Sequence, residues 1–213
     1  MSVISYILIV LVAYLLGSIP TGFLVAKARG IDIRTVGSGN IGATNALRVL
    51  GKRVGAFVLI VDGLKGYAAC AWTCDLLLPL LQVDPAAREH YRLIAGIAAV
   101  LGHNYTCWLN FKGGKGIATT AGVYIALAPL AFGISFATWA LVFVMTRFVS
   151  VASMAAAAGL AVAVWFTKDS LMLGLVTTAL ATLAIAKHKA NIQRLLAGTE
   201  SRISFKSNKG TAP

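Results

Sequence analysis

The stretch VISYILIVLVAYLLGSIPTGFLVA, residues 3–26, decides the fold class, because it contains no charged side chain. A helix that crosses a bilayer needs about 20 predominantly apolar residues. Further apolar runs occupy residues 54–81, 93–109, 117–146, 149–167 and 171–186. The first run lacks a basic leader and is followed by other runs, so we expect a spanning helix rather than a secretory signal. The sequence therefore predicts an integral membrane protein.

The composition agrees with this prediction. Of the 213 residues, 58% are hydrophobic and 12% are charged, whereas a soluble domain has about a quarter of its residues charged. Within lipid every backbone donor and acceptor must be satisfied internally, and the runs lack the short alternation of a membrane β-barrel. An all-α bundle of membrane helices follows.

The chain has a net charge of +12, and most of its cations lie in three groups. The cations between the first two runs, after the third run and at the C-terminal end are Lys27, Arg29, Arg34, Arg48, Lys52, Arg53, then Lys112 and Lys115, then Lys187, Lys189, Arg194, Arg202, Lys206 and Lys209. The positive-inside rule makes all three groups cytoplasmic. Segment 75–92 and the pair Lys168/Asp169 have little net charge and are the expected external loops. Because no nucleic-acid-binding motif is present, anionic lipids or phosphate ligands are the expected partners.

The charge pattern also sets the number of spans. An even number of crossings must connect Gly116 to Lys187, and roughly 70 residues fit four short spans better than two. Pro129, Arg147 and Lys168/Asp169 are the expected breaks. We therefore expect seven transmembrane helices, some of them short, with the N-terminus outside and the C-terminus cytoplasmic. The fourth helix, 117–128, is short enough to be re-entrant, so five spans are the alternative.

The first chemical motif is GSGNIGATNALR, residues 37–48. Glycines let backbone N–H groups converge on an anion, and a helix N-terminus adds its positive dipole end. GSGNIG also matches a dinucleotide fingerprint, but a membrane run follows in place of a βαβ unit, so we reject that match. A glycine-rich turn with capping residues is the alternative to a phosphate cradle. The candidate substrate-binding residues here are Ser38, Gly39, Asn40, Gly42, Thr44, Asn45 and Arg48.

The second motif is GHNYTCWLNFKGGKG, residues 102–116. It is not a Walker A loop, because Leu109 and Gly116 occupy positions that need a glycine and a Ser/Thr. Two lysines around a Gly-Gly hinge can still converge on one phosphate, and Lys115 would lie at the N-terminus of the next helix. The alternative makes both lysines positive-inside anchors. The candidates are Lys115 as a catalytic residue and His103, Lys112, Gly113 and Gly114 as binding residues.

The third motif is HKANIQRLLAGTE, residues 188–200. On a helix, His188, Asn191 and Arg194 cover an arc of about 120°, so all three can face one pocket. Histidine titrates near neutrality and arginine can bind a phosphate in a bidentate manner. Helix capping with an anionic-lipid contact is the alternative. We expect His188 and Asn191 to be catalytic and Arg194 to bind substrate.

Other polar residues lie inside the apolar runs. Asp62 and Lys65 either form a structural ion pair or edge the site, in which case Lys65 binds substrate. Ser153 is expected to contact ligand, with helix-packing contact as the default alternative. The cysteines lack CxxC spacing, and we expect them to fill the core; no metal ligand set is predicted.

In this order, GSGNIGATNALR, DGLKG (62–66), GHNYTCWLNFKGGKG and HKANIQRLLAG resemble the bacterial acyl-phosphate:glycerol-3-phosphate acyltransferases, the PlsY family. The resemblance covers residues 17–200. It implies a seven-helix fold in the inner membrane with a cytoplasmic site. It also implies transfer of a fatty acyl group from acyl phosphate to the 1-hydroxyl of glycerol 3-phosphate, the first acylation of phospholipid biosynthesis, giving lysophosphatidic acid and phosphate. The site residues that it points to are Ser38, Arg48, Lys115, Ser153, His188 and Asn191.

We accordingly expect one transmembrane catalytic domain, 1–198, and a basic, disordered cytoplasmic tail, 199–213. The soluble enzyme that makes acyl phosphate is a candidate partner, and no cofactor is expected. The sequence has no GxSxG elbow and no HxxxxD motif, so we expect direct attack by the substrate hydroxyl. The proton goes either to His188 or to a substrate phosphate oxygen. A carrier for phosphate or organic phosphates is the alternative function, although its cations should gather at mid-membrane.

Overall fold

The computed structural model describes residues 3–203, and over that range the chain forms helices and loops without a strand. The prediction of an all-α protein is confirmed. The chain forms two compact units, Met1–Phe132 and Gly133–Pro213. The predicted basic tail is described only as far as Ile203, and residues 204–213 lie outside the described range.

The elements of the first unit, in chain order, are α1 (Val3–Ser18), α2 (Thr21–Lys27), α3 (Ala43–Leu50), α4 (Lys52–Cys70), α5 (Trp72–Leu80), the 3-10 turn η1 (Pro85–Ala87), α6 (Arg88–Asn104), the 3-10 turn η2 (Cys107–Leu109) and α7 (Ile117–Leu127). Helix α8 (Pro129–Thr146) begins at the end of this unit and belongs mostly to the second. The second unit continues with α9 (Val149–Thr167), α10 (Leu171–Lys187) and α11 (Lys189–Leu196).

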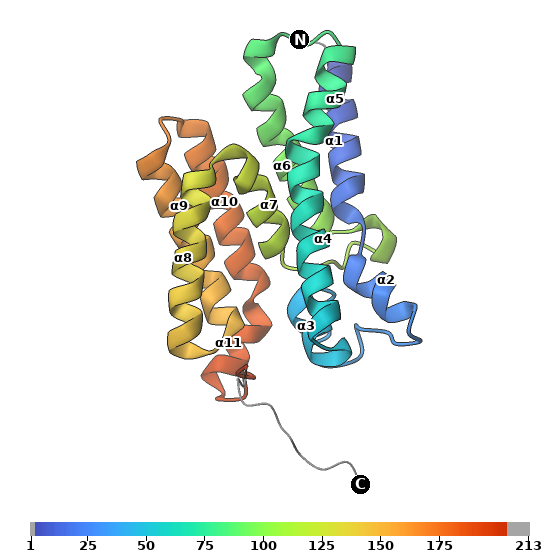
Figure 1. The fold of residues 1–213 in the computed structure, drawn as a ribbon, viewed down its shortest axis with the longest axis vertical. Helices are drawn as coiled ribbons and strands as arrows, with labels where there is room; N and C mark the ends of the chain where they lie inside the picture. Colours follow the sequence, from blue (N-terminus) through green and yellow to red (C-terminus); the bar gives the residue numbers. More distant parts are fainter. Residues whose placement is uncertain (1–2, 204–213) are drawn as a thin grey trace. The chain divides into compact units, whose positions relative to one another are not determined.

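Two helix pairs dominate the packing of the first unit, α1 with α6 and α4 with α7 (Figure 1). In the second pair a Cβ added to Gly122 would overlap the carbonyl oxygen of Gly63, so the two backbones are in direct contact. Such small-residue contacts are the usual way in which membrane helices pack, because the hydrophobic effect does not drive helices together within lipid. The core between α1, α5 and α6 includes Cys74, as predicted for a core-filling cysteine, and Tyr6 stacks on Tyr91 with ring centroids 4.3 Å apart.

The predicted breaks in the second half of the chain are confirmed. Pro129 separates α7 from α8, since α7 ends at Leu127. Arg147 lies between α8 and α9 with a φ of 60°. Lys168 and Asp169 lie between α9 and α10.

The first half contains two breaks that the sequence analysis did not predict. The first apolar run divides at Pro20 into α1 and α2, and the second divides at Ala71 into α4 and α5. Helix α6 begins at Arg88, ahead of its apolar run. The turn before it is stabilised because the Asp84 side chain accepts a hydrogen bond from the Ala86 N–H, 2.9 Å away.

Four stretches of the described residues are long and apolar enough to cross a membrane, with mean hydropathies between 1.5 and 2.3. They are Val3–Lys27, Lys52–Leu80, Pro129–Thr146 and Val149–Thr167, and α10 with α11 makes a fifth if this bent pair is one span. Large apolar side chains such as Ile60, Val144 and Phe166 are more than half exposed on these stretches, as lipid-facing residues would be. The protein is thus a multi-pass membrane protein. The count of seven spans and the orientation of the termini stay predictions.

Candidate functional site

Asn45, in the first turn of α3, organises the glycine-rich loop of the first motif. Its amide nitrogen lies 3.2, 3.1 and 2.9 Å from the carbonyl oxygens of Ile33, Val36 and Asn40, respectively. Its oxygen accepts a hydrogen bond from the Ser38 N–H at 2.8 Å. Asn45 is 1% exposed, so these hydrogen bonds are shielded from water. The amide of Asn45, predicted to bind substrate, here folds the loop around α3.

The other residues of this motif surround the N-terminus of α3. Gly42 is the N-cap of the helix, and its N–H donates to the Asn40 side chain at 2.9 Å. Thr44 and Arg48 follow on α3, where Arg48 lies in the last turn and is half-buried. Such a loop before a helix N-terminus has the form that an anion site requires. That it binds a phosphate stays a prediction.

The second motif folds back onto the end of α6. The Gly113 N–H donates to the Asn104 carbonyl at 3.2 Å, and the Gly114 N–H donates to the His103 carbonyl at 2.9 Å. Lys115 directly precedes Gly116, the N-cap of α7, so its predicted place at a helix N-terminus is confirmed. Lys112 is exposed and Lys115 is half-buried. The lysines thus flank a loop that its own backbone hydrogen bonds hold in place.

The first two motifs share one hydrophobic support in the first unit. Ile41 of the first motif and Leu109 of the second are 4% and 7% exposed and belong to one core cluster, with Ile33, Ala46 and Val58. The second motif is also bound to α1, because the Thr106 hydroxyl donates to the Ser18 carbonyl at 2.6 Å. The structure therefore brings these two predicted motifs together.

Asp62 and Lys65 of α4 form an ion pair within the first unit. The Lys65 ammonium lies 2.9 Å from the Asp62 carboxylate, and both side chains are less than 5% exposed. Lys65 also donates to the Ile19 carbonyl at 2.9 Å. The sequence left two alternatives for this pair, a structural ion pair or a place at the edge of the site. The ion pair is present, and it balances the charge of Lys65 inside the fold.

The third motif lies in the second unit, where α10 and α11 meet at a bend of 52°. His188 is the residue between the two helices and is 3% exposed. Its Nδ1 lies 2.7 Å from the Ala184 carbonyl oxygen. Because a carbonyl only accepts, Nδ1 is assigned the hydrogen, which leaves the lone pair on Nε2. This is the tautomer that a base acting through Nε2 requires.

Sequence analysis missed Glu200, which binds three residues of the second unit. One carboxylate oxygen accepts hydrogen bonds from Ser150 at 2.8 Å and Asn191 at 2.7 Å. The other pairs with Arg194 at 2.7 Å. Glu200 is 8% exposed, so a carboxylate anchors the polar face of α11. Ser153, also predicted as a ligand contact, accepts a hydrogen bond from Trp139 at 3.4 Å.

Glu200 gives the second unit a defined dependence on pH. Burial would raise the pKa of this carboxyl, but the hydrogen bonds from Asn191, Arg194 and Ser150 lower it below its ordinary value of 4.5. A lowered folded-state pKa means that the stabilisation is present above about pH 4.5 and is lost as the pH falls through the folded-state pKa.

We therefore expect the wild type to have a higher Tm than Glu200→Gln, by an amount that is constant above about pH 5 and shrinks at lower pH. This difference would be measured by thermal unfolding in detergent between pH 3 and 8, at pH values about half a unit apart. A Tm difference that does not change with pH would contradict the assignment.

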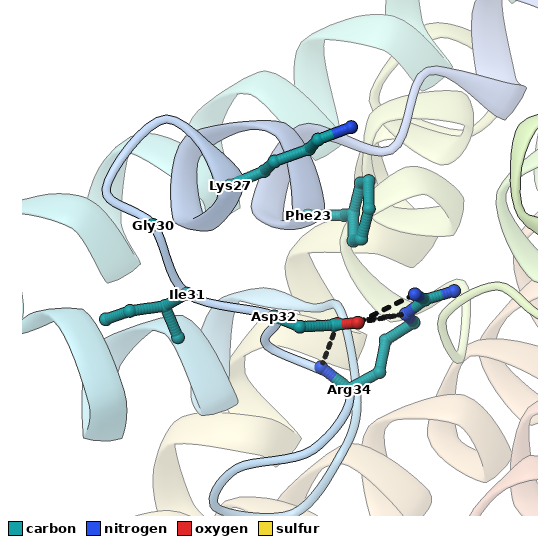
Figure 2. Close-up of a pocket in the computed structure, with 6 residues that line it drawn as sticks. All are labelled: Phe23, Lys27, Gly30, Ile31, Asp32 and Arg34. Atoms are coloured by element: carbon teal, nitrogen blue, oxygen red, sulfur yellow. Dashed lines mark hydrogen bonds and ion pairs between the residues drawn. The ribbon is translucent and has the colours of Figure 1, made fainter.

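A depression of about 320 Å³ lies beside α2, lined by Phe23, Lys27, Gly30, Ile31, Asp32 and Arg34 (Figure 2). The Phe23 ring lies between two cations, with Lys27 Nζ 5.9 Å and the Arg34 guanidinium 4.9 Å from its centroid. Asp32 pairs with Arg34 at 2.7 Å, and this hydrogen bond lowers the pKa of Asp32 to about 2. The carboxylate stays charged and offsets Arg34, so Lys27 supplies the remaining positive charge of this depression.

These features indicate a multi-pass helical membrane protein with glycine- and cation-rich loops. A sequence model of the family described as "Glycerol-3-phosphate acyltransferase" matches residues 7–198. Glycerol-3-phosphate acyltransferases of Geotalea daltonii and Geobacter metallireducens are 46% and 49% identical over 197 residues, which is 92% of this chain and 97% and 96% of theirs.

Solved structures agree. The crystal structure of PlsY (YgiH), an integral membrane glycerol 3-phosphate acyltransferase, in its glycerol 3-phosphate form matches with a TM-score of 0.84 at 38% identity, covering 94% of this chain and 96% of that one. Its lysophosphatidic acid form matches with a TM-score of 0.81 at 36% identity. The chain belongs to the glycerol-3-phosphate acyltransferase family, the PlsY family that its motifs predicted, and it is a membrane acyltransferase.

Proposed function

We propose that the protein transfers a fatty acyl group from acyl phosphate to the 1-hydroxyl of glycerol 3-phosphate, giving lysophosphatidic acid and inorganic phosphate. The observation that carries the proposal is the loop Lys112–Lys115, which ends at the N-terminus of α7 and holds Lys115 beside the helix dipole. Such a loop suits a phosphate, and the relative that binds glycerol 3-phosphate shares the fold. We assign the phosphate of one substrate to this loop.

The second phosphate needs further donors. The predicted donors are Arg48 and the loop around Ser38 in the first unit and His188 in the second, where Asn191 and Arg194 already bind Glu200. Two anionic substrates held side by side gain proximity, and fixed cations stabilise the charge that moves to the leaving phosphate.

The reaction is a direct acyl transfer. The 1-hydroxyl oxygen attacks the carbonyl carbon of the mixed anhydride, forming a C–O bond. The bond between the carbonyl carbon and the bridging oxygen then breaks, and inorganic phosphate leaves with that electron pair. Because phosphate is already a good leaving group, no acyl-enzyme is required.

The proton of the hydroxyl has two possible acceptors, a substrate phosphate oxygen and Nε2 of His188. We favour the phosphate oxygen, because Lys115 would position it at the reacting centre. His188, whose Nδ1 is hydrogen-bonded to Ala184, then acts by orienting a substrate.

For the membrane arrangement we propose seven spans in the bacterial inner membrane, with the site and the C-terminal end of the chain on the cytoplasmic side. We extend the predicted catalytic domain 1–198 to Glu200, because this residue of the predicted tail 199–213 binds Ser150, Asn191 and Arg194. The distribution of lysine and arginine supports this orientation. In this arrangement α6 and α7 are two of the shorter spans. The soluble enzyme that makes acyl phosphate could then deliver its product from the cytoplasm.

The purified protein in detergent, given palmitoyl phosphate and glycerol 3-phosphate, should release lysophosphatidic acid and inorganic phosphate in equal amounts. Acyl thioesters offered in place of acyl phosphate should give no product. Product from a thioester alone would overturn the proposed donor. Phosphate flux into liposomes without lysophosphatidic acid would instead support the carrier.

A further inference from the structure

Three ionisable side chains form a connected group inside the first unit. Asp62 Oδ1 lies 2.9 Å from the Lys65 ammonium and 3.8 Å from His103 Nδ1. The three side chains are 3%, 4% and 6% exposed. Through the Ile19 carbonyl, Lys65 connects this group to the break between α1 and α2.

The other side of His103 faces the second motif. A Cβ added to Gly114 would overlap His103 Nε2, so the imidazole lies directly against the loop backbone. The carbonyl of His103 accepts the hydrogen bond from the Gly114 N–H at 2.9 Å. One residue therefore contacts both Asp62 and the loop that carries Lys115.

We propose that Asp62, Lys65 and His103 are positioning residues, which fix the loop 112–116 for the phosphate of glycerol 3-phosphate. This inference rests on the proposed function of that loop. Asp62 constrains the His103 ring electrostatically, since 3.8 Å is too long for a hydrogen bond. Lys65, which donates to the Ile19 carbonyl, holds Asp62 in place. The ring in turn sets the position of Gly114, next to Lys115.

The energetics favour this role over a stabilising one. Bringing two charges out of water costs free energy that their attraction barely repays, so a buried ion pair is weak evidence for stability. Ionisable residues in membrane helices are correspondingly rare without a functional reason. Removing one partner leaves the other charge buried and unpaired, which destabilises the fold, whereas removing both can leave the free energy of folding almost unchanged.

The sign of the effect on KM distinguishes a positioning role of Asp62 from an effect of its electric field alone. Asp62 carries a negative charge, so by its field alone it weakens the binding of a phosphate. If Asp62 acted only through that field, Asp62→Asn would lower KM for glycerol 3-phosphate. If Asp62 positions the loop, the same variant raises KM.

The decisive variant is Asp62→Asn combined with Lys65→Met, which leaves the net charge unchanged. A displacement of about 1 Å near a reacting centre can cost up to about 100-fold, and a smaller displacement is expected here. We expect KM for glycerol 3-phosphate to rise about tenfold, with kcat and the KM for acyl phosphate within about twofold of the wild type. Steady-state kinetics and thermal unfolding would be measured on the same preparation.

The control with unchanged net charge is Asp75→Asn with Arg88→Met, which removes two ion pairs of Asp75 between α5 and α6, to Arg88 at 2.6 Å and to Arg92 at 2.9 Å. We expect its KM to match the wild type. A folded double variant of Asp62 and Lys65 with wild-type KM would overturn the proposal. If that variant does not stay folded, His103→Gln decides, because it leaves the ion pair intact; an unchanged KM would then overturn the proposal.

The wild-type activity and the KM of the variants together show whether the positioning role or the proposed function is wrong. If the wild type makes lysophosphatidic acid and the variants keep its KM, only the positioning role is wrong. If the wild type shows no saturable use of glycerol 3-phosphate, the proposed function itself is wrong.

Discussion

Lys115→Ala is expected to lower kcat/KM for glycerol 3-phosphate by about 100-fold, because a hydrogen bond to a charged group contributes about 1.5–3 kcal/mol and each 1.4 kcal/mol is tenfold. The reason is geometric, since Lys115 precedes the N-cap of α7 on a loop held by backbone hydrogen bonds. Arg48→Ala should lose a comparable factor. Initial rates of phosphate release with purified variants would measure both effects.

Two further variants complete this experiment. His188→Gln should keep kcat within about tenfold of the wild type, because we assign the proton to a substrate phosphate. Lys168→Ala, which removes a lysine between α9 and α10, is the control for loss of one positive charge. If His188→Gln lost as much rate as Lys115→Ala, the histidine would be the base and our assignment would be wrong.

Glu200→Ala is expected to destabilise the second unit by about 3 kcal/mol, the cost of removing one member of a buried charged network. The change leaves Ser150 and Asn191 without the carboxylate that they bind at 2.8 and 2.7 Å, and Arg194 without its ion pair. Thermal unfolding in detergent should show a clear fall in Tm.

The neighbouring change Thr199→Ala is a matched control, because the Thr199 side chain makes only one long hydrogen bond, 3.4 Å, to the Arg194 carbonyl, and its backbone hydrogen bond is kept. It should shift the stability by less than about 0.5 kcal/mol. Equal Tm values for Glu200→Ala and Thr199→Ala would contradict the anchoring role of Glu200.

Features with a strong local signal were predicted from the sequence. Pro129 lacks a backbone N–H and so breaks the run 117–146, and Arg147 interrupts an apolar stretch that has no other charge. Lys115 could be placed at a helix start because glycines precede an apolar run. The family followed from the motifs together, since four of them occur in order.

Features that depend on contacts distant in sequence were not predicted. Glu200 follows a glycine turn and reads as the start of a tail, and only the fold brings it to Ser150, 50 positions earlier. Asn45 was a candidate ligand because it belongs to the glycine-rich motif, and only the fold shows that its amide hydrogen-bonds to the loop. The partner of His103 could not be predicted either, because Asp62 lies on another helix.

The proposed activity depends most on the loop 112–115 of the first unit, which we assign to the phosphate of glycerol 3-phosphate. A structure determined with glycerol 3-phosphate and a non-reactive acyl phosphonate would test this assignment. We predict the phosphate of glycerol 3-phosphate on the loop 112–115, beside Lys115. A phosphate bound away from this loop, for example beside Phe23 and Arg34, would contradict the assignment.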